Sequence, residues 1–193
     1  MQQLIVFLAL VAVAFCAPTE LPKHGEILDS SCPFPNGTDK AIYSYMCSSH
    51  EQFRIDNITV TDMKGKPIYP IDPTKEFILN LYSYNNGPQI DDNKVNVTLY
   101  QYTKGWVGNS CNWNMLPTYG LLDGIDGCEF AHNCPLTSGP LVLQLPMDLS
   151  QFSVIINMLA AYKPYQLEIR LFDYNAGSKH EEIACVMAQV ELS

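Results

Sequence analysis

Apolar and polar residues alternate in most of the apolar segments that follow residue 41. Successive side chains of a β-strand point to opposite faces, so this alternation predicts strands with one buried face. Val95–Tyr102 and Leu167–Phe172 alternate almost completely. Further apolar segments are also expected to form strands: Ala41–Cys47, Phe53–Val60, Phe77–Tyr84, Leu141–Leu145 and Ile183–Leu192.

Turn-forming residues separate the expected strands. Asp62–Pro67, Asn85–Pro88 and Asn175–Ser178 are each rich in residues that adopt tight turns. About seven or eight strands at this spacing are typical of an antiparallel β-sandwich rather than of alternating strands and helices. The sequence therefore predicts an all-β fold.

One apolar segment, Gln151–Tyr162, has helical rather than alternating spacing. It ends before Pro164, and its apolar residues lie at helical positions: Phe152, Ile155, Ile156 and Leu159. Two interpretations remain open. The segment is either a short helix or strand packed on the core, or an apolar lip beside the mouth of a cavity.

Residues 1–16 have the pattern of a secretory signal peptide. Leu4–Phe15 is an apolar run that is too short to cross a bilayer as a helix. Ala14 and Cys16 are small enough for the signal-peptidase site, which predicts cleavage before Ala17. Cleavage after Ala17 and an uncleaved anchor helix are the alternatives.

Removal of the signal peptide leaves 193 − 16 = 177 residues, the length of one ordinary domain. Residues 17–40 contain several prolines and little periodicity, and we expect them to form an extended N-terminal arm. Residues 41–193 are expected to form the sandwich domain. The formal net charge is −9, with only 11 basic residues, which argues against nucleic acid as a partner.

The sequence contains no short motif of a common enzyme class. It has no G-x-S-x-G, no H-E-x-x-H, no Walker loop and no G-x-G-x-x-G. Its histidines are far apart in the sequence, so no catalytic triad is indicated: His24, His50, His132 and His180. We therefore expect a protein that is not an enzyme.

Two groups of residues carry side chains that can bind metals. Cys128, His132 and Cys134 could ligate zinc, but they lack a second pair of ligands, and a secreted chain favours a disulfide. The second group consists of acidic residues without the spacing of a calcium-binding EF-hand: Asp91, Asp92, Asp123, Asp126 and Glu129. We expect neither a metal nor another cofactor.

Six cysteines remain after removal of the signal peptide: Cys32, Cys47, Cys111, Cys128, Cys134 and Cys185. An even number in a secreted chain predicts three disulfides, for which about 15 pairings are possible. Asn36, Asn57 and Asn96 each begin an N-x-T sequence and are predicted glycosylation sites.

Several segments resemble the ML lipid-recognition domain family. Tyr45–Cys47 resembles the first cysteine of the family, and Cys128–Leu136 resembles the small disulfide loop of its sterol carriers, which also closes with Asn-Cys-Pro. Other segments resemble the lysosomal ganglioside activator, the branch to which the chain is most similar: Thr118–Gly120, Leu99–Cys111 and Ile183–Val186. These segments occur in the family order.

The resemblance implies an immunoglobulin-like sandwich, or β-cup, with a lipid in an apolar cavity between its sheets. It implies disulfides Cys47–Cys185 and Cys128–Cys134, which leaves Cys32 and Cys111 as the third pair. The chain lacks the additional cysteines of the ganglioside activator after Cys111. It also lacks a basic patch of the kind that lipopolysaccharide recognition needs.

We therefore expect a secreted or lysosomal protein that holds and transfers a glycolipid, phospholipid or sterol. Strand alternation selects the candidate cavity residues: Ile78, Leu81, Val97, Leu99, Leu143, Ile169 and Leu171. The candidate residues of the cavity mouth, which would contact a membrane transiently, are Trp106, Trp113, Leu121, Leu122, Phe152, Ile155, Ile156 and Leu159. One alternative is a non-catalytic activator or receptor subunit that presents lipid to a hydrolase or to a receptor of innate immunity. Another is an extracellular sandwich with a filled core.

Overall fold

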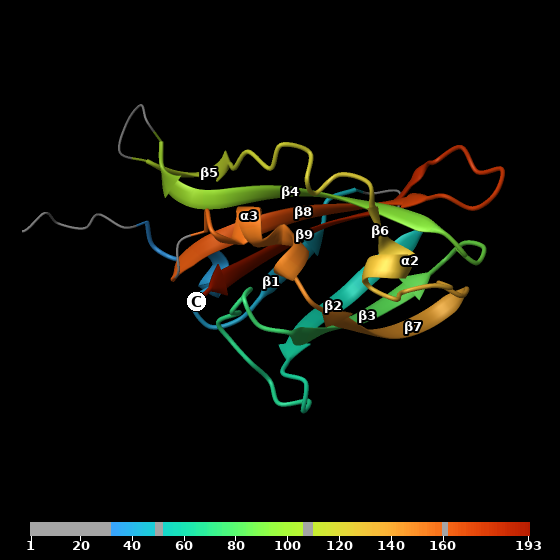
Figure 1. Ribbon diagram of the computed structural model, residues 1–193, viewed down its shortest axis with the longest axis horizontal. Helices are drawn as coiled ribbons and strands as arrows, with labels where there is room; N and C mark the ends of the chain where they lie inside the picture. Colours follow the sequence, from blue (N-terminus) through green and yellow to red (C-terminus); the bar gives the residue numbers. More distant parts are fainter. Residues whose placement is uncertain (1–31, 49–51, 106–109, 160–161) are drawn as a thin grey trace, which may run out of the picture. The chain divides into compact units, whose positions relative to one another are not determined.

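The strands of the protein form two antiparallel sheets that lie face to face (Figure 1). This computed structural model describes residues 32–48, 52–105, 110–159 and 162–193. The expected signal peptide, residues 17–31 of the expected arm and Trp106 lie outside these ranges. Within them, the predicted all-β sandwich is confirmed.

The first sheet has six strands in the order β1–β9–β8–β4–β5, with β6 beside β4. Its strands are β1 (Tyr43–Met46), β4 (Asn93–Lys104), β5 (Cys111–Met115), β6 (Ile125–Asp126), β8 (Lys163–Asp173) and β9 (Glu182–Leu192). β5, which is only five residues long, was not predicted from the sequence. It forms because it pairs along the edge of β4, from Tyr100 opposite Met115 to Lys104 opposite Cys111.

The second sheet has three strands in the order β2–β3–β7. They are β2 (Phe53–Thr61), β3 (Phe77–Asn85) and β7 (Gly139–Met147). Short helices occur in the connections: η1 (Pro35–Gly37), α2 (Gly127–Phe130), η2 (Ser150–Phe152) and α3 (Ser153–Ile156). No helix in the described part of the chain is long and apolar enough to cross a membrane.

The two sheets meet through the apolar rows that the alternation predicts. In the first sheet Val97 pairs with Ile169, and Ile169 pairs with Val186. In the second sheet Leu81 pairs with Leu143. Leu81 and Val186 belong to one buried cluster that spans both sheets. Burial of such rows, at roughly 25 cal/mol per Å², is the main term that stabilises a sandwich.

A β-bulge in β2 explains why alternation is only partial between Phe53 and Val60. The register with β3 shifts between Ile55 and Asn57, so Asp56 is an extra residue in β2. Residues three apart in a regular strand point to opposite faces. The bulge allows Ile55 and Ile58 to pack in the same cluster between the sheets.

Residues 32–40, expected to belong to the extended arm, pack against the outer face of the first sheet. The side chain of Asn36 donates a hydrogen bond of 2.7 Å to Gln189 of β9. Thr38 is fully buried, and its carbonyl oxygen accepts a hydrogen bond from the hydroxyl of Tyr69. The sandwich unit therefore begins at about Cys32 rather than at residue 41.

The structure contains three disulfides: the two pairs that the family resemblance implies and the pair that these leave over. They are Cys32–Cys111, Cys47–Cys185 and Cys128–Cys134. The second joins the end of β1 to β9 across 138 residues of sequence. Such disulfides indicate folding in an oxidising compartment.

Loss of the long-range disulfide should cost more stability than loss of the short one. The chain-entropy relation gives about 5 kcal/mol for the separation of 138 residues and about 2 kcal/mol for the separation of 6. Unfolding in guanidinium should therefore show a larger decrease for Cys47→Ala/Cys185→Ala than for Cys128→Ala/Cys134→Ala. Equal losses in the two double variants would contradict this prediction.

Candidate functional site

An apolar cavity of about 320 Å³ lies between the two sheets. The inner faces of β2, β3 and β7 line one side, and those of β4, β8 and β9 line the other. Residues of α2, η2 and α3 and of the connecting segments also contribute to the lining. Among the described residues of this lining, Asn133 is the one with a polar side chain.

Six of the seven candidate cavity residues lie in this lining: Leu81, Val97, Leu99, Leu143, Ile169 and Leu171. Ile78 does not line the cavity, so its assignment as a cavity residue is corrected. Phe77, Leu79 and Leu81 line the cavity from β3, which places Ile78 on the outer face of that strand. Ile78 and Leu81 are three residues apart and cannot share one face of a regular strand.

Five of the candidate mouth residues also line the cavity: Leu122, Phe152, Ile155, Ile156 and Leu159. The segment with helical spacing forms η2 and α3, and Ile155 is only 4% exposed. The segment therefore forms a short helix, as the first interpretation proposed. The same helix also directs apolar side chains to the cavity, as the second interpretation proposed.

The other candidate mouth residues lie elsewhere. Leu121 lines a neighbouring groove and is 48% exposed. The assignment of Trp113 to the cavity mouth is corrected. Its ring packs against that of Tyr102, with 5.0 Å between the ring centroids. These two residues pair across β4 and β5 on the face that points away from the cavity. Trp106 lies outside the described residues.

Sequence reasoning missed part of the lining. β9 contributes Ala184, Val186, Ala188 and Val190, which alternate along the strand. This alternation was a signal that could have identified them. Phe130 also lines the cavity, but it lies in the short loop between two cysteines, where no local pattern indicates its direction.

A groove of about 760 Å³ adjoins the cavity. The cavity and the groove share four lining residues: Ile125, Phe130, Met147 and Phe152. The rings of Phe130 and Phe152 form an edge-to-face pair with 5.4 Å between their centroids. This aromatic pair therefore marks the junction between the groove and the cavity.

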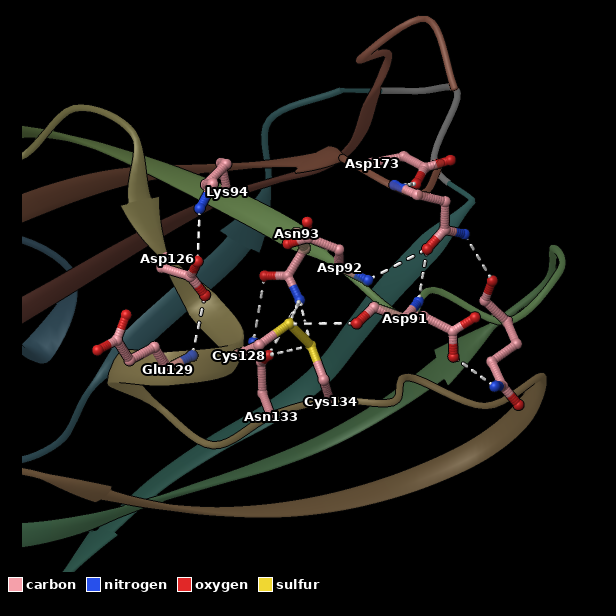
Figure 2. The surroundings of a disulfide bond; sticks show 12 residues. Asp91, Asp92, Asn93, Lys94, Asp126, Cys128, Glu129, Asn133, Cys134 and Asp173 are labelled. Atoms are coloured by element: carbon pink, nitrogen blue, oxygen red, sulfur yellow. Dashed lines mark hydrogen bonds and ion pairs between the residues drawn. A yellow bond between two sulfur atoms is a disulfide. The ribbon is translucent and has the colours of Figure 1, made fainter. Parts of the chain in front are cut away.

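The disulfide loop that carries Phe130 is held by Asn93 of β4 (Figure 2). Asn93 is fully buried, and its side-chain nitrogen donates hydrogen bonds of 3.0 Å to Asn133 and to the sulfur of Cys134. A buried amide without such partners would be costly. These contacts fix the loop, and with it Phe130, against the first sheet.

Asp126 fixes the start of α2 beside this loop (Figure 2). Its carboxylate accepts a hydrogen bond of 2.9 Å from the backbone N–H of Glu129 and forms an ion pair with Lys94. Both contacts favour the charged form. The ammonium of Lys94 and then this N–H hold the pKa of Asp126 below its usual value.

The metal-binding groups considered from the sequence are engaged in other contacts. Cys128 and Cys134 form a disulfide and supply no thiolate to zinc. Asp92, Asp126 and Cys128 lie within 4.8 Å of one another, but the same disulfide removes Cys128 as a thiolate ligand. Asp126 is paired with Lys94.

The three sequon asparagines are in different environments. Asn36 and Asn57 are exposed, whereas Asn96 is half-buried. The side-chain oxygen of Asn96 accepts a hydrogen bond of 2.7 Å from the backbone of Gly124. Asn57 follows the bulge of β2 and presents its side chain to solvent.

Comparison with known proteins does not assign a family to this chain. No protein-family model and no curated protein matches the chain. Among solved structures it is similar to the crystal structure of the C-terminal domain of Wzt. The two share 8% sequence identity over 81% of each chain, with a TM-score of 0.40. Similarity at this level says nothing about function.

Gly127→Ala tests how tightly the disulfide loop packs on β4. A Cβ at this position would overlap the side-chain oxygen of Asn93. Because Asn93 is buried and hydrogen-bonded, it cannot move away without losing its partners. We expect Gly127→Ala to lower the free energy of unfolding by about 1–3 kcal/mol.

Glu129→Ala is the matched control, since it adds alanine to the same helix at an exposed position. It should change the free energy of unfolding by only a few tenths of a kcal/mol. Similar losses for both alanine variants would show that the contact between Gly127 and Asn93 does not restrain the loop.

Proposed function

We propose that the protein binds a lipid between its two sheets and transfers it between membranes without catalysing a reaction. The observation that carries this proposal is the apolar cavity, whose lining comes from both sheets and, in the part of the chain that the structure describes, contains one polar side chain, Asn133. The resemblance to the ML lipid-recognition domain family supports the same function.

An unfilled apolar cavity lowers the stability of a protein. Its lining residues lose dispersion contacts, and the cost increases with cavity volume. Water does not compensate, because an apolar cavity offers it no hydrogen-bond partners. A volume of about 320 Å³ is within the range of ligand sites, at its lower end. An apolar chain is therefore the ligand that this cavity favours.

Burial of the chain alone supplies useful affinity. Each buried methylene contributes roughly 0.8 kcal/mol, so about ten methylenes contribute about 8 kcal/mol. Association costs offset a substantial part of that gain. Contacts to the polar end of the lipid therefore add to the affinity and decide which lipid is preferred.

Exposed apolar side chains near the cavity support contact with a membrane. Val154 and Met158 are 61% and 47% exposed, and they flank Ile155, which lines the cavity. Leu121 lies in the adjoining groove. Exposed apolar groups at one opening are typical of surfaces that insert into a lipid interface. They would allow a lipid to enter the cavity without crossing water.

The disulfides support an oxidising compartment. Three disulfides are typical of proteins that fold in an oxidising environment, which fits a route to the lysosome or the extracellular space. The predicted signal peptide and glycosylation sites support the same route. We propose that the protein is secreted or delivered to lysosomes, and that exposed Asn36 and Asn57 carry glycans.

Filling the cavity should abolish lipid binding. Ala188 lines the cavity from β9, and the larger ring of Ala188→Phe would occupy space that a lipid chain needs. We expect the affinity for the uncharged fluorophore N-phenylnaphthylamine to decrease at least tenfold, and co-purified lipid to disappear from native mass spectra. Ala176→Phe makes the same change in an exposed turn and should bind normally. Unchanged binding by a folded Ala188→Phe protein would overturn the proposed function.

Membrane contact predicts a separate effect on transfer. Val154→Asp places a charge at the exposed lip and should slow transfer of a fluorescent lipid between neutral vesicles several-fold, with binding in solution unchanged. Val142→Asp is the matched control, because Val142 is 64% exposed on the outer face of β7. If both variants transfer lipid at the wild-type rate, the lip does not contact the membrane.

A further inference from the structure

The groove beside the cavity is strongly acidic. Five carboxylates line it: Glu76, Asp123, Asp126, Glu129 and Asp148. None of the described residues in its lining is a lysine or arginine. Lys94 offsets one of these charges through its ion pair with Asp126. A ligand that enters the cavity through the groove therefore places its polar end in a negative potential.

These carboxylates belong to elements that are far apart in the sequence. Glu76 precedes β3, Asp123 and Glu129 flank β6, and Asp148 follows β7. The backbone N–H of Ser150 donates a hydrogen bond of 2.9 Å to Asp148, which lowers the pKa of that carboxyl. Asp126 and Asp148 therefore remain charged at lower pH than an ordinary aspartate.

The aromatic pair at the junction adds a second preference. Phe130 and Phe152 line both the groove and the cavity. The faces of aromatic rings attract cations, and quaternary ammonium groups are commonly bound by aromatic side chains. An ammonium group next to this pair would lie between the carboxylates of the groove and the apolar cavity.

We propose that the lipid held by this protein is a single-chain amphiphile with an ammonium headgroup. This inference rests on the proposed function and specifies its ligand. The chain occupies the cavity, and the ammonium group lies at the junction, near Phe130 and Phe152. The volume of about 320 Å³ fits one chain better than two. Anionic headgroups are disfavoured, because they would bring like charges together in the groove.

Three amphiphiles with the same chain and different headgroups test this proposal. The probes are decyltrimethylammonium, the uncharged decyl glucoside and the anion decanoate, measured by calorimetry below their micelle-forming concentrations. We expect decyltrimethylammonium to bind at least tenfold more tightly than decanoate, with decyl glucoside between them. The ratio of the affinity for decyltrimethylammonium to the affinity for decanoate should decrease as salt is added, because salt screens the exposed carboxylates.

Charge removal shows whether the groove causes this preference. Asp123→Asn/Glu129→Gln removes two exposed carboxylates from the groove and should reduce the ratio several-fold. Asp39→Asn/Glu181→Gln changes the net charge equally, at exposed residues that do not line the groove, and should preserve the ratio. Equal effects of the two double variants would overturn the proposal, because they would assign the preference to net charge alone.

The outcomes separate this inference from the proposed function. If the three amphiphiles bind with equal affinity, the ammonium preference is wrong and lipid binding stands. If decyltrimethylammonium binds Ala188→Phe as well as the wild type, the cation binds an acidic surface and not the cavity, which also overturns the proposal. If neither the amphiphiles nor N-phenylnaphthylamine bind, the proposed function itself fails.

Discussion

The inner faces of the two sheets do not fill the space between them, and the candidate site depends on this incomplete packing. Protein interiors are normally packed as densely as organic crystals. Here β9 lines the space with small side chains, including Ala184 and Ala188. The large buried ring of Tyr165 packs in a different core cluster from that of Ala188.

The site also depends on a polar anchor outside the cavity. Asn93 binds the disulfide loop to β4, and Asp126 holds the start of α2 through Lys94. These contacts are compatible with the apolar cavity because the amide of Asn93 and the carboxylate of Asp126 both have partners. They set the position of Phe130, which belongs to both the cavity and the groove.

The cavity and the groove have complementary roles in the proposed function. Apolar burial is nearly independent of the kind of lipid chain, so the cavity provides affinity with little selectivity. Charges placed where the polar end lies discriminate between headgroups, because like charges oppose binding. Only the outer part of the ligand is then exposed to the acidic groove. In the proposed function, the cavity therefore supplies the affinity for the lipid chain, and the groove selects the headgroup.

The sequence by itself determined the sandwich and a minority of the cavity lining, chiefly residues of the alternating strands and of the segment with helical spacing. Alternation along a strand is local, so Val97, Leu99 and Ile169 could be assigned to an inner face without coordinates. The same rule fails where the register changes, because the bulge at Asp56 depends on pairing with β3. The outer position of Ile78, in contrast, follows from alternation with Phe77 and Leu79 in β3. Only the tertiary structure decided that the sheets leave a cavity, and that Glu76, Asp123 and Asp148 meet beside it. These features arise from contacts between residues far apart in the chain, and a local pattern carries no information about them.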